Sequence, residues 1–190
     1  FHIPLAVALI GDAGQLPLQL ADAEANTESA DNTELVLSVS QPEQQFVFSN
    51  IKEEPVPSLL RGFSAPVKLD FDYSRDQLLR LMRSDSDGFC RWDASQQLGL
   101  AEIKRAISAL AAGQNVSPDA EYINACRELL ADTSLDAAMV ALMLQLPSEA
   151  YLAEIIHPVD VQGIHQAREA LRKVLAQALR IARLLFALRK

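Results

Sequence analysis

The sequence lacks the motifs around which most hydrolytic and nucleotide-binding sites are built. Its three histidines form no His-Glu-x-x-His pattern, so a zinc site of the kind carried on one helix face is excluded. Its seven glycines are scattered and form neither a phosphate-binding loop nor a Gly-x-Ser-x-Gly elbow. No apolar run approaches the roughly 20 residues that a membrane-spanning helix needs. We therefore expect a soluble protein without a catalytic centre of these types.

Basic residues are scarce in the first third of the chain. Residues 1–73 hold three of them against eleven acidic residues, whereas residues 74–190 hold fourteen of each. Binding to nucleic acid or to an anionic membrane needs clustered Lys and Arg. The last predicted helix alone has such a cluster: Arg168, Arg172, Lys173, Arg180, Arg183, Arg189 and Lys190. Solvated cations beside an apolar stripe are the commoner origin of this pattern, so we expect neither partner.

Cysteine is nearly absent, and the two that occur, Cys90 and Cys126, fall on different predicted helices. A disulfide between them stays open from the sequence, but two reduced thiols in the cytoplasm are the simpler interpretation. Cys90 lies near a predicted helix start, where a thiol becomes more acidic, yet a nucleophilic role also needs a histidine base nearby. We interpret Cys90 as a packed thiol.

The three histidines have no partners at the spacing of metal ligands. His157 and His165 are separated by Pro158, so they do not lie one turn apart on a continuous helix, and His2 is far from both in sequence. Glu154 precedes His157 by three residues, but a site built from Glu-x-x-His needs a second such pair. We interpret all three histidines as structural or surface residues.

What the sequence does contain is a strand-rich first third. Short segments with period-two alternation, separated by turn residues, predict strands. These segments are residues 5–9, 16–20, 35–39, 46–48 and 67–72. We expect the first two to pair as one hairpin and the next two as a second, with residues 21–32 as a surface loop. The count falls short of the about seven strands of a closed immunoglobulin-like sandwich, so the sandwich is expected to be incomplete.

From Ser74 onward the period changes to that of helices. Ser74 predicts the N-cap of a first helix, and Gly113 predicts the end of a second. The apolar stripe of the second helix is Phe89, Trp92, Leu100, Ile103, Ile107 and Leu110. Because Phe89 and Trp92 share one helix face, we interpret them as core residues and not as a ligand pocket.

Capping residues predict three further helix starts. Ser117-Pro118-Asp119 is expected to open a helix, Thr133 with Asp136 resembles a capping box, and Asp160 caps a final helix that runs to about Arg189. The stripe of that final helix is Ile164, Ala167, Leu171, Val174, Ala178, Ile181, Leu185 and Leu188.

Two shorter segments complete the helical part. Residues 148–156 predict a short helix that stops before Pro158. Residues 135–146 are apolar nearly all round, so we expect a central, buried helix there. The short loops favour antiparallel helices stacked in an armadillo-like way. The predicted fold is α+β in two segregated domains: an incomplete immunoglobulin-like sandwich over residues 1–73 and an all-α domain over residues 74–190.

Three motifs resemble the aminopeptidase N family of zinc aminopeptidases. Residues 55–69, PVPSLLRGFSAPVKL, are similar to the segment that closes the family's third domain. Residues 89–96, FCRWDASQ, resemble the family's Phe-Ser-Arg-Trp-Asp-Ala-Ala-Gln at the start of its helical domain, and residues 1–7, FHIPLAV, resemble its Leu-His-Ile-Pro strand. The motifs keep the family's order and spacing.

The resemblance implies a parent with a β-rich domain, a thermolysin-like catalytic domain, a small β-sandwich and a large helical domain. This chain is expected to span the third domain and the start of the fourth. Because the first residue, Phe1, lies inside a predicted apolar strand, we expect the chain to be a piece of a longer polypeptide. The family's zinc ligands, catalytic glutamate and Gly-Ala-Met-Glu-Asn motif belong to its catalytic domain. No catalytic, cofactor-binding or metal residue is therefore carried over to this chain.

The expected function is a non-catalytic region of a zinc-dependent enzyme that removes N-terminal amino acids from peptides, bridging the catalytic and helical domains. Its expected partners are the parent's own catalytic and C-terminal domains, with peptide substrates reached only through the parent. Zinc is expected in the parent and no cofactor in this region, which should be inactive alone. The alternative is an independent β-sandwich and helical module that binds a protein and has no enzyme attached.

Overall fold

The computed structural model describes residues 2–21 and 32–187, with side chains up to residue 180. Most of the loop predicted at residues 21–32 lies outside the described residues, as do the last three residues of the chain. A small antiparallel sheet is followed by helices, which confirms the predicted α+β class. The chain divides into two compact units, Phe1–Asp93 and Ala94–Lys190. The predicted domain boundary at residues 73–74 stays a prediction, and the first compact unit extends beyond it.

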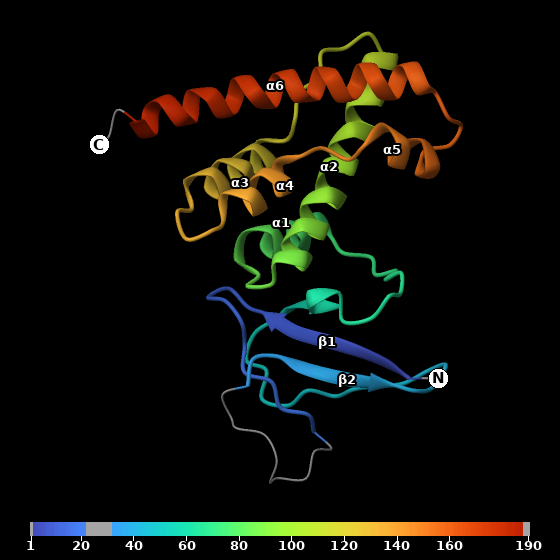
Figure 1. Cartoon of the computed structure of the whole chain (residues 1–190), viewed down its shortest axis with the longest axis vertical. Coiled ribbons are helices and arrows are strands. Elements are labelled where there is room, and N and C mark those ends of the chain that lie inside the picture. The colour runs from blue at the N-terminus through green and yellow to red at the C-terminus, as the bar shows by residue number, and fades with distance from the viewer. Residues whose placement is uncertain (1, 22–31, 188–190) are drawn as a thin grey trace. The chain divides into compact units, whose positions relative to one another are not determined.

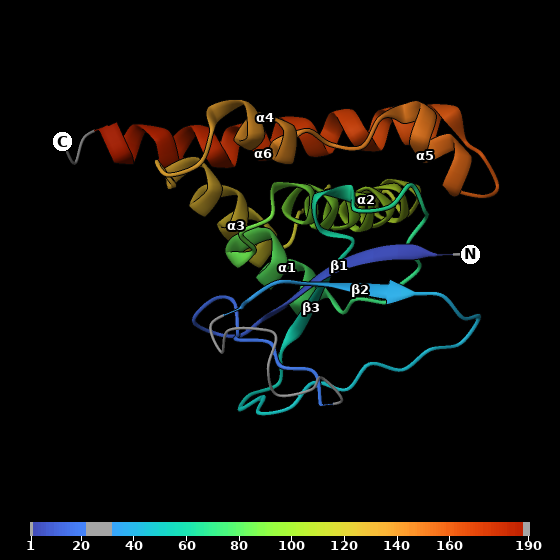
Figure 2. The same ribbon diagram turned by 60° about the horizontal axis from the view of Figure 1, so that its bottom comes forward.

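The sheet of the first unit has three strands, β1 (Ile3–Ile10), β2 (Leu35–Val39) and β3 (Val56–Leu59). Their order is β2-β1-β3, and both outer strands run antiparallel to β1 (Figures 1 and 2). Val7 in β1 lies opposite Leu35 of β2 and Leu59 of β3, so it is paired on both sides.

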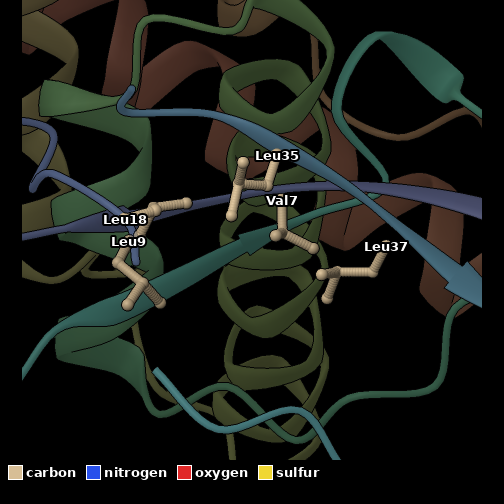
Figure 3. Packing of buried hydrophobic residues seen from close by; sticks show 5 residues of the cluster. All are labelled: Val7, Leu9, Leu18, Leu35 and Leu37. Carbon is tan, nitrogen blue, oxygen red and sulfur yellow. The ribbon is translucent and has the colours of Figure 1, made fainter. Parts of the chain in front are cut away.

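One face of this sheet carries the apolar core that the alternation predicts. The buried cluster, shown in Figure 3, comprises Val7, Leu9, Leu18, Leu35 and Leu37. Residues two apart along a strand share a face, which is why Val7 and Leu9 face this cluster together. Leu18 joins them from the segment that follows β1, and half-buried aromatic and aliphatic side chains pack around the cluster.

Strand pairing differs from the two hairpins predicted. The first predicted hairpin forms only at its turn, where Ile10 bridges Gln15 and the Leu16 N–H donates to the Leu9 carbonyl at 2.8 Å. Residues 16–20 then meet residues 46–48 through a bridge between Leu20 and Phe48, while β2 pairs with β1. The prediction failed because alternation identifies a strand's faces but does not identify its partner.

A further strand was missed, and one was wrongly expected. The Pro-containing segment Val56–Leu59, which was not among the predicted strands, is β3, and in it Pro57 lies opposite Leu9. Proline is tolerated on an edge strand because no neighbour needs its missing N–H. Residues 67–72 alternate strictly but have no strand assignment, and Leu69 and Phe71 are exposed.

Helix α1 (Arg75–Ser84) begins as predicted. The Ser74 hydroxyl accepts the Gln77 backbone N–H, and the Gln77 side chain accepts the Ser74 N–H, so the pair forms a capping box. Helix α2 (Gly88–Ala111) ends close to Gly113, whose φ of +70° explains why glycine occupies that position.

The remaining helices are α3 (Ala120–Ala131), α4 (Ala137–Leu144), α5 (Glu149–Ile155) and α6 (Val161–Ala187). The Asp160 carboxylate accepts the Gly163 N–H at the start of α6, as predicted, and Ser148 caps the short helix α5. Two other caps were predicted too early. Asp119 caps α3 in place of Ser117, and Asp136 itself caps α4 in place of Thr133.

Burial within the helices corrects two expectations. Along α2 the buried apolar side chains are Cys90, Ala94, Leu98, Ile103 and Ala106, while Trp92 and Leu110 of the predicted stripe are exposed. The predicted core role of Trp92 is therefore wrong.

Helix α4, expected to be central, buries only Met143 among its residues, and Leu142 is 49% exposed. A sequence that is apolar all round shows that a helix has a large apolar surface. Whether that surface is buried depends on how many neighbouring elements pack against it.

Helix α6 supplies the long apolar stripe of the second unit. Ile164, Ala167 and Leu171 are buried as predicted, whereas Val174 and Ala178 of the predicted stripe are half-buried and Leu175 is buried in their place. Helices α3 and α5 pack against α6 (Figures 1 and 2). No helix in the described part of the chain is both long and apolar enough to cross a bilayer.

Adjacent residues of β2 test the orientation of the sheet. Leu35 is 6% exposed and Val36 is 64% exposed. Leu35→Ala should lower the free energy of unfolding by about 2–5 kcal/mol because it opens a cavity in the core. Val36→Ala should change it by less than about 0.5 kcal/mol. Urea unfolding of the intact chain measures both, and equal effects would contradict the assigned register.

A buried arginine network as the candidate functional site

The histidines considered as metal ligands lie apart and have other partners. His2 Nε2 is 2.6 Å from Ser38 Oγ, and His165 Nδ1 is 2.9 Å from Glu149 Oε1, while His157 is exposed. Among the described residues no group of three or more His, Cys, Asp or Glu side chains is arranged to hold a metal ion. These residues do not fit a zinc site, and no zinc-dependent step is assigned to them.

Both cysteines are free and buried. The Cys90 thiol donates to the Leu59 carbonyl at 3.3 Å, and burial raises its pKa well above the ordinary 9.0. Burial likewise raises the pKa of the Cys126 thiol to about 12. Thiols held in the neutral form are poor nucleophiles and poor metal ligands. The packed role interpreted for Cys90 agrees with this environment.

The most concentrated polar chemistry of the first unit surrounds Arg61, which is 4% exposed. Its Nε donates to Glu34 Oε2 at 2.8 Å, its Nη1 to Ser58 Oγ at 2.9 Å, and its Nη2 to Ser86 Oγ at 2.8 Å. Nη1 also donates to Asp85 Oδ1 at 2.5 Å. The guanidinium thus gathers β3, the segment before β2 and the loop between α1 and α2.

Arg61 and Asp85, the central charged groups of this network, are almost inaccessible to water. Burial by itself lowers the pKa of Arg61, but the hydrogen bond to Glu34 and the charge of Asp85 outweigh it and raise that pKa above its ordinary value. Arg61 is therefore a fixed cation. The Asp85 side chain is fully buried, its Oδ1 also accepts the Asp87 N–H, and its Oδ2 has no hydrogen-bond partner. Asp85 depends on Arg61 for its charge compensation because water does not reach it.

Further hydrogen bonds join the same segments. The Gly62 N–H donates to Asp87 Oδ2 at 3.0 Å, and the Tyr73 hydroxyl donates to the Pro57 carbonyl at 2.8 Å. Burial raises the pKa of Tyr73 above its ordinary 10.0, so this hydroxyl keeps its proton. The start of the helical part is consequently fastened to β3 and the turn that follows it.

That turn has an unusual backbone. Leu60, Gly62 and Phe63 have φ values of 60°, 58° and 53°, in the left-handed region. Residues other than glycine pay roughly 1–2 kcal/mol there. The turn buries Leu60, whereas the Phe63 ring is 52% exposed. Phe63 lies 5.4 Å from Phe89 between ring centroids, and Phe89 lies 6.0 Å from Trp92.

The second unit has a buried carboxylate of its own. Glu102 is 1% exposed, and its Oε2 accepts the Asp119 N–H at 3.1 Å while its Oε1 accepts from Arg105 Nη1 at 3.3 Å. It lies beside an open hollow of about 510 Å³ lined by α2, the loop at 114–118 and Leu171. Because Oε2 holds the cap of α3 and Oε1 pairs with Arg105 of α2, the role of Glu102 is structural.

Arg61 and Asp85 were not singled out from the sequence. Arg61 was counted as one of three scarce cations of residues 1–73, and that scarcity was the available signal. An isolated basic residue inside an otherwise apolar and small-residue segment, PSLLRGF, is a candidate for a paired, buried charge. Asp85 carries no comparable local signal, because its partner is 24 residues away.

Changing Asp85 and changing Glu34, two partners of Arg61, should have very different effects on the free energy of unfolding. Asp85→Ala leaves the buried guanidinium without its buried counter-charge and should lower the free energy of unfolding by about 3–5 kcal/mol. Glu34→Gln changes a partner whose side chain is 50% exposed, and should cost about 0–1 kcal/mol. Urea denaturation of the two variants gives both values. Similar losses would mean that the Arg61–Asp85 pair is not the principal one.

Alkaline pH should weaken the fold through Cys126. The unfolded thiol, with its ordinary pKa of 9.0, releases its proton at lower pH than the folded thiol at about 12. The stabilisation is therefore complete below pH 9 and lost as pH rises toward 12. Over that window the free energy of unfolding should fall by up to about 1.4 kcal/mol per pH unit more in the wild type than in Cys126→Ala. Parallel pH profiles would show that this thiol is not protected.

The chain matches known families along most of its length. Residues 1–72 match a domain of unknown function with an Ig-like fold, DUF3458, and residues 75–187 match its companion DUF3458_C, described as ARM repeats. The predicted immunoglobulin-like and armadillo-like parts are thereby confirmed.

Named relatives are aminopeptidases. Aminopeptidase N of Escherichia coli K12 is 40% identical over 179 residues, and that of Haemophilus influenzae is 35% identical over 179 residues; each alignment covers 94% of this chain and 20% of the relative. The crystal structure of Legionella pneumophila aminopeptidase A in complex with aspartic acid superposes with a TM-score of 0.74 at 29% identity, over 95% of this chain and 19% of that one. The chain thus spans about one fifth of the length of these relatives. It belongs to the DUF3458 family, an Ig-like domain followed by ARM repeats, within the aminopeptidase N proteins.

Proposed function

We propose that this chain is a non-catalytic region of a zinc-dependent aminopeptidase that removes N-terminal amino acids from peptides. In this proposal it bridges the catalytic domain, which holds the zinc, to the helical domain. The observation that carries the proposal is the Arg61 network, because its donors lie in the Ig-like match and its acceptors Asp85 and Ser86 lie in the ARM-repeat match.

A structural bridge must fix the position of one domain relative to the next. A two-residue junction between domains does not do so alone. Residues 73–74 separate the Ig-like and ARM-repeat matches. The ion pair from Arg61 to Asp85 and the bond from Gly62 to Asp87 add fixed points on both sides of this junction. The loop between α1 and α2 is then held by Arg61 and Gly62, and such a hold is the property a structural bridge requires.

The proposed partners are the catalytic and C-terminal domains of the same enzyme, and peptide substrates meet this region only through that enzyme. We place the protein in the cytoplasm. Support comes from Cys90 and Cys126, which are both free and buried, a state that a reducing compartment maintains.

Activity measurements on two proteins test this function. The isolated chain should not hydrolyse an aminoacyl anilide, with or without added zinc. A chimera of the Escherichia coli aminopeptidase N, in which this chain replaces the matching 179-residue segment, should hydrolyse it. The same chimera carrying Asp85→Ala should lose thermal stability, because the bridge loses its buried counter-charge.

Either of two results would contradict the proposal. Hydrolysis by the isolated chain, together with stoichiometric zinc binding, would place a catalytic site within it. A folded but inactive chimera would show that this chain does not serve as the bridging region of such an enzyme. Glu34→Gln in the chimera is the matched control, since it alters a half-exposed partner of the same arginine.

A further inference from the structure

We infer that three aromatic side chains, Phe63, Phe89 and Trp92, form a docking surface for the catalytic part of the aminopeptidase polypeptide. This aromatic patch is the place where the proposed bridge would meet that part, so the inference rests on the proposed function and adds residues to it.

The geometry of the patch is that of a surface and not of a core. Phe63 is 52% exposed and Trp92 is 36% exposed, while Phe89 is half-buried between them. The centroid distances of 5.4 and 6.0 Å, with tilted rings, are those of favourable aromatic pairs. Aromatic residues that are grouped, rigid and exposed are the residue type that anchors protein interfaces.

The backbone of the turn that presents Phe63 on this surface is strained. Phe63 is a bulky residue held at a φ of 53°, and Leu60 at 60° begins the same turn. The Arg61 network and the bond from Gly62 to Asp87 hold the turn in place. A conformation maintained against its local preference, and used to expose an aromatic ring, indicates a function beyond packing.

Two facts select the occupant. The aminopeptidase relatives are about five times as long as their match to this chain, so most of such an enzyme lies outside it. The unit Phe1–Asp93 has fifteen acidic residues against seven basic ones, including Asp87 and Asp93 beside the patch in sequence. Two copies with this charge repel each other. The surface that docks here should be apolar and fringed by Lys or Arg.

Hydroxyl-radical footprinting with mass spectrometry compares the patch in the two proteins already described. In the isolated chain Phe63 and Trp92 should be oxidised readily. In the active chimera both should be protected several-fold. Trp92 is the single tryptophan of this chain, so its peptide reports the patch without ambiguity.

One variant is expected to have different effects on stability in the isolated chain and in the chimera, and it therefore distinguishes docking from folding. Asn tolerates the left-handed conformation better than Phe, so Phe63→Asn should leave the isolated chain as stable as the wild type or more stable. In the chimera the same substitution should lower the melting temperature by several degrees, since the docked surface loses its anchor. Phe71→Asn is the control, because Phe71 is 41% exposed and its ring pairs with that of Tyr73 at 4.4 Å and, among the described rings, with none of the patch.

The outcomes divide cleanly. Protection of Phe63 and Trp92 in an active chimera, with destabilisation by Phe63→Asn alone, supports the inference. An active chimera in which both residues stay reactive overturns it and leaves the bridging function standing. Concentration-dependent protection in the isolated chain would identify a second copy as the occupant and also overturn it. A folded, inactive chimera contradicts the proposed function, and the docking inference falls with it.

Discussion

The buried guanidinium of Arg61 is the constraint on which the first unit depends. A charge removed from water must be paired and hydrogen-bonded, or it costs several kcal/mol. Here the pairing requires Glu34 before β2, Ser58 in β3 and Asp85 after α1 to be in place at once. None of these segments can adopt its native position alone without leaving a charge or a donor unsatisfied. The sheet and the first helix of the ARM-repeat match therefore form one cooperative body.

This requirement also explains how a strained turn persists next to Arg61. The left-handed residues Leu60 and Phe63 flank the arginine on both sides, so any relaxation of the turn would move the guanidinium away from its acceptors. The hydrogen bonds of the network hold the turn in this conformation, and the strain remains in the native state. The Phe63 ring is displayed as a consequence, whereas Leu60 is buried beside the strand it follows.

The sequence predicted what depends on near neighbours along the chain and failed where the partner is distant. The caps at Ser74 and Asp160 were found because a cap is a contact across three residues. Strand pairing was wrong because β2 selects β1 and not the neighbouring segment at 46–48. The Arg61–Asp85 pair was missed for the same reason, since nothing local to Asp85 marks it as buried.

Family membership and chemistry were carried by different residues. The motifs that resemble aminopeptidase N, residues 55–69 and 89–96, contain the Arg61 turn and the aromatic residues that touch it. They were recognisable because their order of residues is unusual, although their physical role could not be read before Asp85 was placed beside Arg61. The resemblance therefore coincides with the parts that join the Ig-like segment to the helical one.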